Sequence, residues 1–200
     1  RFPGKWAAFA ALAVCLVAMR YVVESHPVLV HDRRTTDFPA TRLPDQVVLT
    51  WSDDPATTQA VQWRTAVDAP PARVRYRPAE ETDTAAWRYA DAATEVFEDP
   101  YLINNPSVAH HTVTLRGLRS GARYTYQVGN GERWSEAATF ATAPEQTSDF
   151  GFMYLGDAQN GLDAWGDLLR DAWDRHPRAR FCILAGDLVN RGGDRGDWDA

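Results

Sequence analysis

The chain has 200 residues, a net charge of −6 and a pI near 5.3, and 44% of its residues are hydrophobic and 12% aromatic. This composition supplies enough apolar side chains for one or two packed domains and excludes a wholly disordered chain. An acidic chain gains nothing from attraction to a phosphate backbone, so nucleic acid is excluded as the expected partner.

The first 25 residues predict a signal peptide or a membrane anchor. Arg1 and Lys5 precede an apolar run from Trp6 to Met19, and a charged start before a short apolar stretch is typical of export signals. The run is shorter than the about 20 residues that span a bilayer, so cleavage, anchoring and a buried core helix all stay open. We expect a secreted, periplasmic or membrane-tethered protein. Residues 26–43 are polar and predict a linker.

Residues 44–143 alternate apolar and polar side chains in short stretches, as half-buried strands do. The alternation predicts strands at 46–51, 60–64, 72–77, 112–115 and 124–128. Short strands at this spacing, without a helical pattern between them, indicate a β-sandwich. The segment from Leu118 to Tyr124 resembles the corner of fibronectin type III domains, in which a Leu fills the core, a Gly turns the chain and a Tyr hydroxyl bonds to the backbone.

Several side chains outside the main motifs have a structural interpretation. Most tryptophans at strand spacing are expected in the sandwich core, with sugar stacking as the alternative; they are Trp51, Trp63, Trp87 and Trp134. Neighbouring strand residues point to opposite faces, so His110 and His111 are not expected to chelate one ion together. A solvated loop is expected to carry the acidic cluster of Asp194, Asp197 and Asp199.

Residues 144–200 change to the pattern of an α/β domain. Apolar runs at 150–155 and 181–185 are typical of strands covered on both faces. Between them, apolar side chains recur at helical spacing, and Asp163 is the expected N-cap of that helix. A strand, a helix and a strand in this order predict a right-handed parallel crossover.

Each of these two predicted strands runs into a Gly-Asp pair, and the two aspartates are 30 positions apart (187 − 157 = 30). Loops after parallel strands open on the same edge of the sheet, so Asp157 and Asp187 are expected side by side. Two carboxylates at short range repel unless one is protonated or a cation lies between them. Hard metal ions favour carboxylate and amide oxygens. One Gly-Asp end is also common as a helix cap or in nucleotide-binding folds, whereas the repeat favours a metal site.

Two signatures of a known family follow the predicted strands. Gly156-Asp157-Ala158-Gln159 and the segment from Gly186 to Gly192, Gly-Asp-Leu-Val-Asn-Arg-Gly, resemble the first two signatures of the calcineurin-like metallophosphoesterases. Residues 110–144 resemble the N-terminal domain of purple acid phosphatases. The resemblance implies a fibronectin type III-like β-sandwich followed by the first βαβ part of an α/β metallophosphoesterase domain, truncated at the C-terminus. The later Gly-Asn-His and histidine motifs of the family do not occur in the 200 residues, so we expect half a site and an inactive isolated chain.

The resemblance also implies roles for individual residues. Asp157 would bind one metal ion and Asp187 would bridge two, which makes Asp187 the expected catalytic residue. Gln159 and Asn190 are further candidate ligands, with a polar loop residue as the alternative for each. Asn190 occupies the position of the iron-binding Tyr of purple acid phosphatases, which predicts a colourless site. Arg191 is the candidate substrate-binding residue, because a guanidinium can hold phosphate by two hydrogen bonds; a surface arginine is the alternative.

The expected function is hydrolysis of a phosphate mono- or diester by a metal-activated water. The expected cofactors are two metal ions, such as Fe, Zn or Mn, and the expected partner is a phosphorylated small molecule or ester substrate. An extracytoplasmic binding or scaffold module with an inactive α/β remnant is the alternative. The sequence leaves the metal, the substrate and the oligomeric state open.

Overall fold

The computed structural model describes residues 33–69, 71–146 and 149–199. The predicted signal peptide or anchor at 1–25 and the first part of the predicted linker lie outside the described residues. The chain divides into a unit of residues 1–34 and a unit of residues 35–200, and the second unit carries all the elements below. Within the described ranges, no helix combines the length and apolar character needed to cross a membrane.

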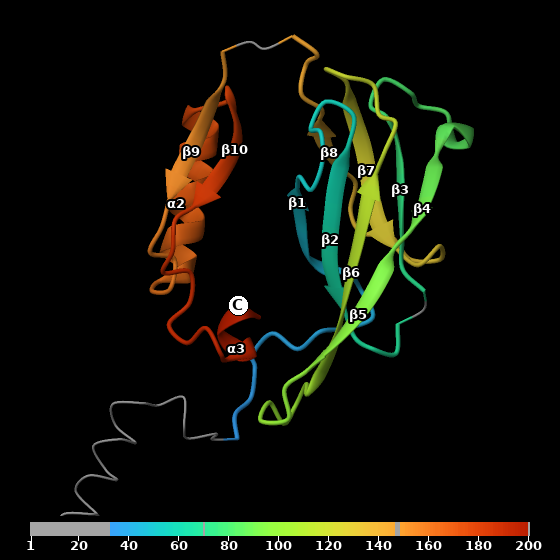
Figure 1. The fold of residues 1–200 in the computed structure, drawn as a ribbon. Helices are drawn as coiled ribbons and strands as arrows, with labels where there is room; N and C mark the ends of the chain where they lie inside the picture. Colours follow the sequence, from blue (N-terminus) through green and yellow to red (C-terminus); the bar gives the residue numbers. More distant parts are fainter. Residues whose placement is uncertain (1–32, 70, 147–148, 200) are drawn as a thin grey trace, which may run out of the picture. The chain divides into compact units, whose positions relative to one another are not determined.

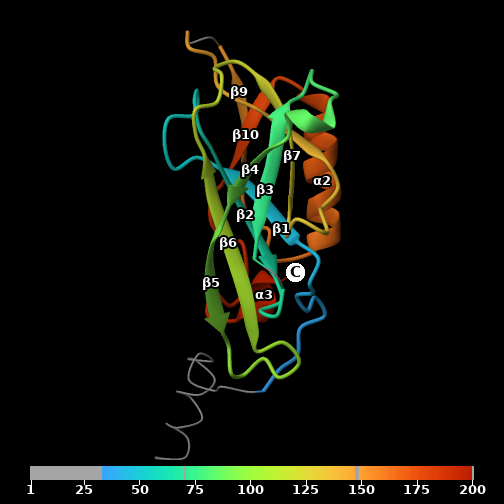
Figure 2. The same cartoon turned by 90° about the vertical axis from the view of Figure 1, so that its right-hand side faces the viewer.

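Two four-stranded antiparallel sheets form a β-sandwich (Figure 1 and Figure 2). The first sheet has the order β1-β2-β6-β5 and contains β1 (Asp45–Thr50), β2 (Gln59–Thr65), β5 (Ala93–Glu98) and β6 (Ser107–Leu115). The second has the order β4-β3-β7-β8 and contains β3 (Arg73–Pro78), β4 (Arg88–Asp91), β7 (Arg123–Gly129) and β8 (Ala138–Ala141), with a 3-10 turn, η2 (Thr84–Ala86), before β4. The prediction of a β-sandwich is confirmed. The alternation missed β4, β5 and β8, and all six residues of β5 are exposed, which leaves no apolar face to detect.

Apolar side chains from both sheets form one buried cluster. In the pairing of β3 with β7, Val74 lies opposite Val128 and Tyr76 lies opposite Tyr126. Opposite residues of an antiparallel pair are on the same face of the sheet, so these side chains pack together. The cluster contains Val61, Trp63, Val74, Tyr76, Leu115, Leu118, Tyr124, Tyr126, Val128 and Phe140. Burial of these side chains is the main stabilising contribution to the sandwich.

A ladder of arginine and aromatic side chains covers the outer face of the second sheet. The guanidinium of Arg75 lies 4.7 Å from the ring centroid of Trp87 and 4.5 Å from that of Trp134, and Arg77 lies 4.5 Å from Trp87. The expectation that most of the four strand-spaced tryptophans are core residues is therefore wrong, because Trp63 alone of these four is buried and Trp51 is 41% exposed. Alternation in β3 puts its arginines on the outer face, where exposed cation–π contacts contribute about 0.5–1 kcal/mol each.

The predicted corner forms at the turn into β7. The backbone N–H of Arg119 donates to the hydroxyl of Tyr124 at 2.8 Å. Leu118 is buried in the core, and Gly121 has a φ of 64°, a left-handed conformation that favours glycine. The fibronectin-like corner is confirmed.

A parallel β-α-β unit follows the sandwich. It consists of β9 (Gly151–Leu155), α2 (Leu162–Arg175) and β10 (Ala179–Leu184), and β9 pairs with β10 in parallel. The predicted N-cap Asp163 is wrong: the helix begins at Leu162 after Gly161, whose φ is 67°. Asp163 lies in the first turn instead, where its charge complements the helix dipole. The last element is α3 (Arg195–Trp198).

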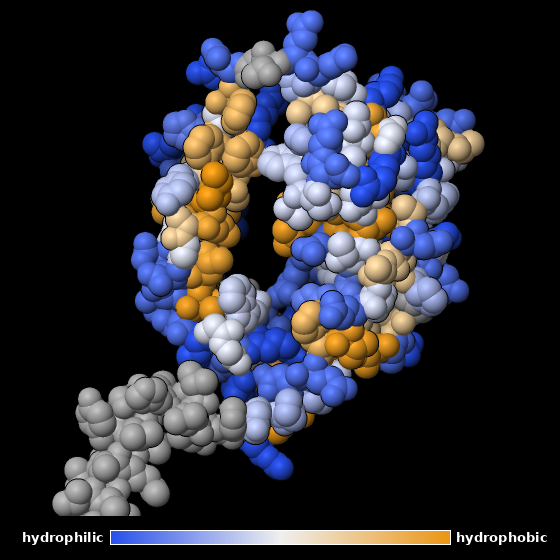
Figure 3. Space-filling model, in the orientation of Figure 1, coloured by the Kyte–Doolittle hydropathy of each residue, from blue (hydrophilic) through white to orange (hydrophobic). Residues whose placement is uncertain are grey.

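One face of the two-stranded sheet is apolar and exposed. Phe150, Phe152 and Tyr154 are 57%, 51% and 70% exposed, and Figure 3 shows apolar surface over these strands. Met153, which points to the opposite face, is buried. The expectation that β9 is covered on both faces therefore does not hold among the described residues. A single helix covers only one face of a sheet, which is the physical reason for the difference.

Two threonines hold the ring of buried His111. Its Nε2 lies 2.8 Å from Thr65 Oγ1, and its Nδ1 lies 2.8 Å from Thr94 Oγ1. Burial lowers the pKa of His111 below the ordinary value of 6.5, and the neighbouring His110 lowers it further. The folded state therefore favours the neutral imidazole.

Replacing Tyr124 by Phe removes the hydroxyl that accepts from Arg119. We expect the free energy of unfolding to fall by about 1 kcal/mol, because the backbone N–H of Arg119 loses its acceptor. Urea denaturation measures the change. Tyr126→Phe is the matched control, since Tyr126 is buried in the same cluster and its hydroxyl makes no hydrogen bond recorded among the described residues. Equal losses in the two variants would contradict the role of the corner bond.

Stability of the sandwich is expected to fall as the pH drops through the ordinary pKa of histidine. The unfolded state binds a proton near pH 6.5, whereas folded His111 binds it only at lower pH, so unfolding takes up protons in between. The stability loss stops below the folded pKa. Chemical denaturation between pH 7.5 and about 5 measures the slope. His111→Gln should reduce the slope, and the remainder comes from His110, whose pKa burial also lowers. An unchanged slope would assign the effect to groups other than His111.

Candidate functional site

The loops after β9 and β10 contact each other at one edge of the sheet. Leu155 and Leu184, the last residues of the two strands, are opposite each other in the parallel register. The N–H of Asp157 donates to Gly186 O at 3.3 Å, and the N–H of Gln159 donates to Asp187 O at 3.0 Å. The structure therefore brings together the backbones that carry the two predicted carboxylate ligands.

Both aspartates have a backbone conformation that is unfavourable for a residue with a Cβ atom. Asp157 has a φ of 55° and Asp187 a φ of 48°. Within the described part of the chain, Gln46 is the only other non-glycine residue with a positive φ. Left-handed conformations cost on the order of 1–3 kcal/mol for such residues and concentrate at functional sites. The same strain at two adjacent strand ends points to a constraint on the direction of the two side chains.

Gln159 has a side-chain oxygen that is free to bind a ligand. Its Oε1 is buried and has no hydrogen-bond partner among the described residues. Buried polar atoms are rarely left unpaired, and each exception requires an explanation such as a role in binding an ion. An amide oxygen on a loop whose backbone bonds to Asp187 is a suitable donor for a hard metal ion. The donor set of Asp157, Asp187 and Gln159 therefore fits a metal ion.

Asn190 ties the two loops together. Its Nδ2 donates to Gln159 O at 2.9 Å, so the amide nitrogen is used within the protein. This bond joins the loop after β10 to the loop after β9. The side-chain oxygen of Asn190, Oδ1, is the atom that stays available as a candidate metal ligand. The loop interpretation and the ligand interpretation are therefore compatible.

Arg191 is engaged by carboxylates of its own segment. Its Nη2 lies 2.7 Å from Asp197 Oδ1 and 3.1 Å from Asp194 Oδ2, and its backbone N–H donates to Asp197 Oδ2 at 2.9 Å. The hydrogen bond with Asp197 raises the pKa of Arg191. Arg191 therefore stabilises the loop here, and its predicted contact with a substrate phosphate requires an exchange of these bonds.

Other acidic and histidine side chains do not join the two aspartates. Across residues 33–69, 71–146 and 149–199, no group of three or more His, Cys, Asp or Glu residues is close enough to hold a metal ion. His110 and His111 lie in β6, paired with β2 and β5. Among the described residues, the candidate ligands are therefore the carboxylates of Asp157 and Asp187 and the side-chain oxygens of Gln159 and Asn190.

The sequence pattern missed two residues that hold this region in place. Arg64 in β2 and Asp199 after α3 are buried and form an ion pair. The expectation that Asp194 and Asp199 lie in a solvated loop is wrong, because both are buried. Alternation assigns Arg64 to the outer face of its sheet, and no local signal indicates that another segment covers it.

Comparison with known families matches residues 44–142 to the family described as purple acid phosphatase, N-terminal domain. Comparison with curated proteins gives no match. Among solved structures, the chain is similar to the chicken CNTN1 FN1-FN3 domains, with 18% identity and a TM-score of 0.35, over 52% of this chain and 31% of that chain. The fn3 domain of the human collagen alpha-1(XX) chain has 22% identity and a TM-score of 0.33, over 54% of this chain and 89% of that chain.

The structure of PhoD has 15% identity to this chain and a TM-score of 0.45. The similarity covers 78% of this chain and 29% of the PhoD chain. The family match covers both sheets of the sandwich and the tyrosine corner. The sandwich, residues 44–142, therefore matches the purple acid phosphatase N-terminal domain family.

Proposed function

We propose that this chain belongs to a metal-dependent phosphoesterase that hydrolyses a phosphate mono- or diester. The observation that carries the proposal is the pair of left-handed aspartates, Asp157 and Asp187, at adjacent carboxyl ends of parallel strands. Ligands of α/β sheets bind outside these strand ends. The unpaired Oε1 of Gln159 in the loop after β9 and the family match of the preceding sandwich support it.

Each residue of the centre has a proposed role. Asp157 would hold one metal ion, Asp187 would serve both, and Gln159 would supply its amide oxygen. Metal ions bound there would supply Lewis acidity and activate a water for attack on phosphorus. Asn190 keeps the two loops in contact through its bond to Gln159 O, and the ion pairs of Arg191 hold the second loop in shape.

The proposed substrate class and cellular location are based on the sequence. The substrate class is a phosphorylated small molecule or ester, and the acidic chain disfavours a nucleic-acid partner. We propose an extracytoplasmic location on the basis of the predicted export segment at 1–25. The sandwich has the role of a support and carries none of the proposed metal ligands.

A titration with Mn²⁺ tests the centre. We expect Mn²⁺ to stabilise the chain against thermal unfolding, by about 2.7 kcal/mol at a hundredfold excess over the dissociation constant. Asp157→Asn and Asp187→Asn should each abolish the shift, because an amide cannot replace a charged ligand. Electron paramagnetic resonance of free Mn²⁺ measures binding directly.

Asp163→Asn is the control for this titration, since it changes the same charge on the first turn of α2. Binding that survives both substitutions at 157 and 187 would refute the metal centre. Absence of any binding to the unsubstituted chain would favour the alternative of a binding or scaffold module. Hydrolysis of p-nitrophenyl phosphate and its diester by the metal-loaded full-length gene product tests the reaction itself.

Glycine substitutions test whether the two aspartates are kept for function. Asp157→Gly and Asp187→Gly relieve the positive φ, so we expect the free energy of unfolding to stay equal or to rise by about 1 kcal/mol. Both variants should lose Mn²⁺ binding. Asp163→Gly places glycine in a helix and should lower stability by about 1 kcal/mol. A comparable loss at 157 and 187 would show that the aspartates serve the fold.

A further inference from the structure

The short helix α3 lacks an apolar anchor. None of its four residues is buried, and Trp198 is 49% exposed. Isolated helices shorter than about 12–15 residues are marginal in water, so this helix takes its order from contacts outside itself. Polar contacts with the sandwich are the contacts that the structure shows.

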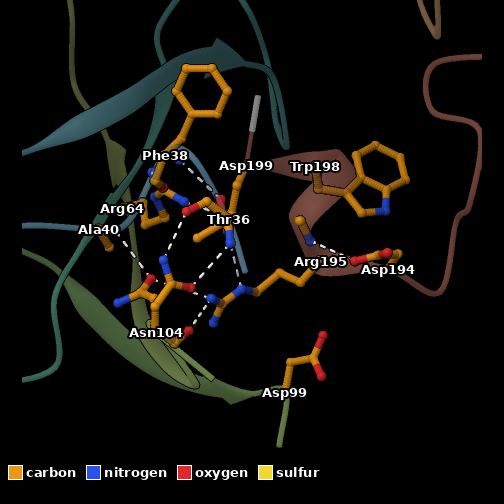
Figure 4. A network of polar contacts seen from close by, with 12 residues as sticks. Thr36, Phe38, Ala40, Arg64, Asp99, Asn104, Asp194, Arg195, Trp198 and Asp199 are labelled. Carbon is orange, nitrogen blue, oxygen red and sulfur yellow. Dashed lines mark hydrogen bonds and ion pairs between the residues drawn. The ribbon is translucent and has the colours of Figure 1, made fainter. Parts of the chain in front are cut away.

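The first contact is a buried ion pair around Arg64. The guanidinium donates from Nε to Asp45 Oδ1 at 2.8 Å and from Nη2 to Asp45 Oδ2 at 2.8 Å, a two-pronged pairing within the first sheet. Its Nη1 donates to Asp199 Oδ1, directly after α3. Figure 4 shows Arg64 and Asp199 directed toward each other. The side chains of Arg64 and Asp199 are only 2% and 3% exposed, so solvent hardly screens the pair.

Further bonds hold the same helix. Arg195 Nη2 donates to the backbone oxygen of Asn105, and it lies 3.2 Å from Asn105 Oδ1. Gln46 Nε2 donates to Trp198 O at 3.0 Å. Together with the Arg64 pair, these bonds attach α3 to β1, to β2 and to the loop before β6.

The same helix is bonded to the loop of the candidate centre. Asp197 of α3 binds both the backbone N–H and the guanidinium of Arg191. Arg191 is the fourth residue after Asp187. Trp198 Nε1 adds a bond to Gly192 O at 3.0 Å. A continuous set of bonds therefore runs from Arg64 through α3 to the loop that begins at Asp187.

We propose that Arg64 is a positioning residue, which fixes the loop carrying Asp187 to the sandwich through Asp199. This inference rests on the proposed function, because the loop matters as part of a metal centre. It gives the sandwich a definite role in that centre. Through this chain of bonds, the first sheet would hold the loop after β10 against the loop that carries Asp157.

Two single substitutions around the same guanidinium test the proposal. Asp199→Asn weakens the bond that crosses to α3, whereas Asp45→Asn weakens the partner within the first sheet. Each variant leaves Arg64 one carboxylate, so both chains are expected to fold. Hydrogen–deuterium exchange of the full chain follows the hydrogen-bonded amides of Asp194, Asp197 and Asp199, and Mn²⁺ titration follows the centre.

For Asp199→Asn we expect exchange of these amides to accelerate by on the order of tenfold, since breaking a buried pair frees the segment. We also expect the dissociation constant for Mn²⁺ to rise about threefold or more, a loss below 1 kcal/mol. Asp45→Asn should accelerate exchange in β1 and β2 and leave both readouts of the loop at the unsubstituted values.

The outcomes separate this inference from the proposed function. Unchanged exchange at 194–199 in Asp199→Asn, or equal acceleration in Asp45→Asn, overturns the positioning role of Arg64. Faster exchange with unchanged Mn²⁺ affinity overturns it as well, because the segment would be attached without positioning the centre. Absence of Mn²⁺ binding to the full-length gene product refutes the proposed function, and with it the positioning of a metal centre. The exchange data still report whether Arg64 holds the segment.

Discussion

A single guanidinium buried between two carboxylates connects the two halves of this structure. The carboxylate of Asp45 in β1 binds the Arg64 guanidinium by two hydrogen bonds, and Asp199 after α3 supplies a second carboxylate. The hydrogen bonds with Asp45 raise the pKa of Arg64, so the charge is permanent. Removing both partners of a buried charge typically costs several kcal/mol, because the charge then stays behind without compensation, whereas one remaining carboxylate still neutralises Arg64. The charge balance at Arg64 therefore couples the first sheet to the segment after β10.

The two outer faces of the sandwich are stabilised in different ways. On the first sheet, the polar contacts of α3 cover Arg64. On the second, Arg75 and Arg77 lie against Trp87 and Trp134, so planar cations and rings cover the sheet without a further layer of chain. The inner faces share one apolar cluster. Among the described residues, the segment of α3 and Asp199 is bonded to β1 and β2 of the first sheet.

The loops after β9 and β10 contain several locally unfavourable features. Asp157 and Asp187 both adopt a conformation that glycine would adopt more easily, although glycines directly precede them. Gln159 keeps a buried oxygen without a partner among the described residues. Natural proteins accept such unfavourable features mainly where function requires them. Strain and an unpaired oxygen at one edge of the sheet are features expected of a pair of metal-binding loops.

The sequence by itself determined the sandwich, the tyrosine corner, the β-α-β order and the positions of the two Gly-Asp ends, because alternation, turn chemistry and helical spacing are local properties. It did not reveal β5, whose exposed residues carry no apolar face, or the ladder that keeps Trp87 and Trp134 out of the core. Only the tertiary structure decided that Arg64 and Asp199 are buried together, although 135 positions separate them (199 − 64 = 135). Alternation tells which face of a sheet a side chain takes, and the segment that covers that face depends on the path of the whole chain.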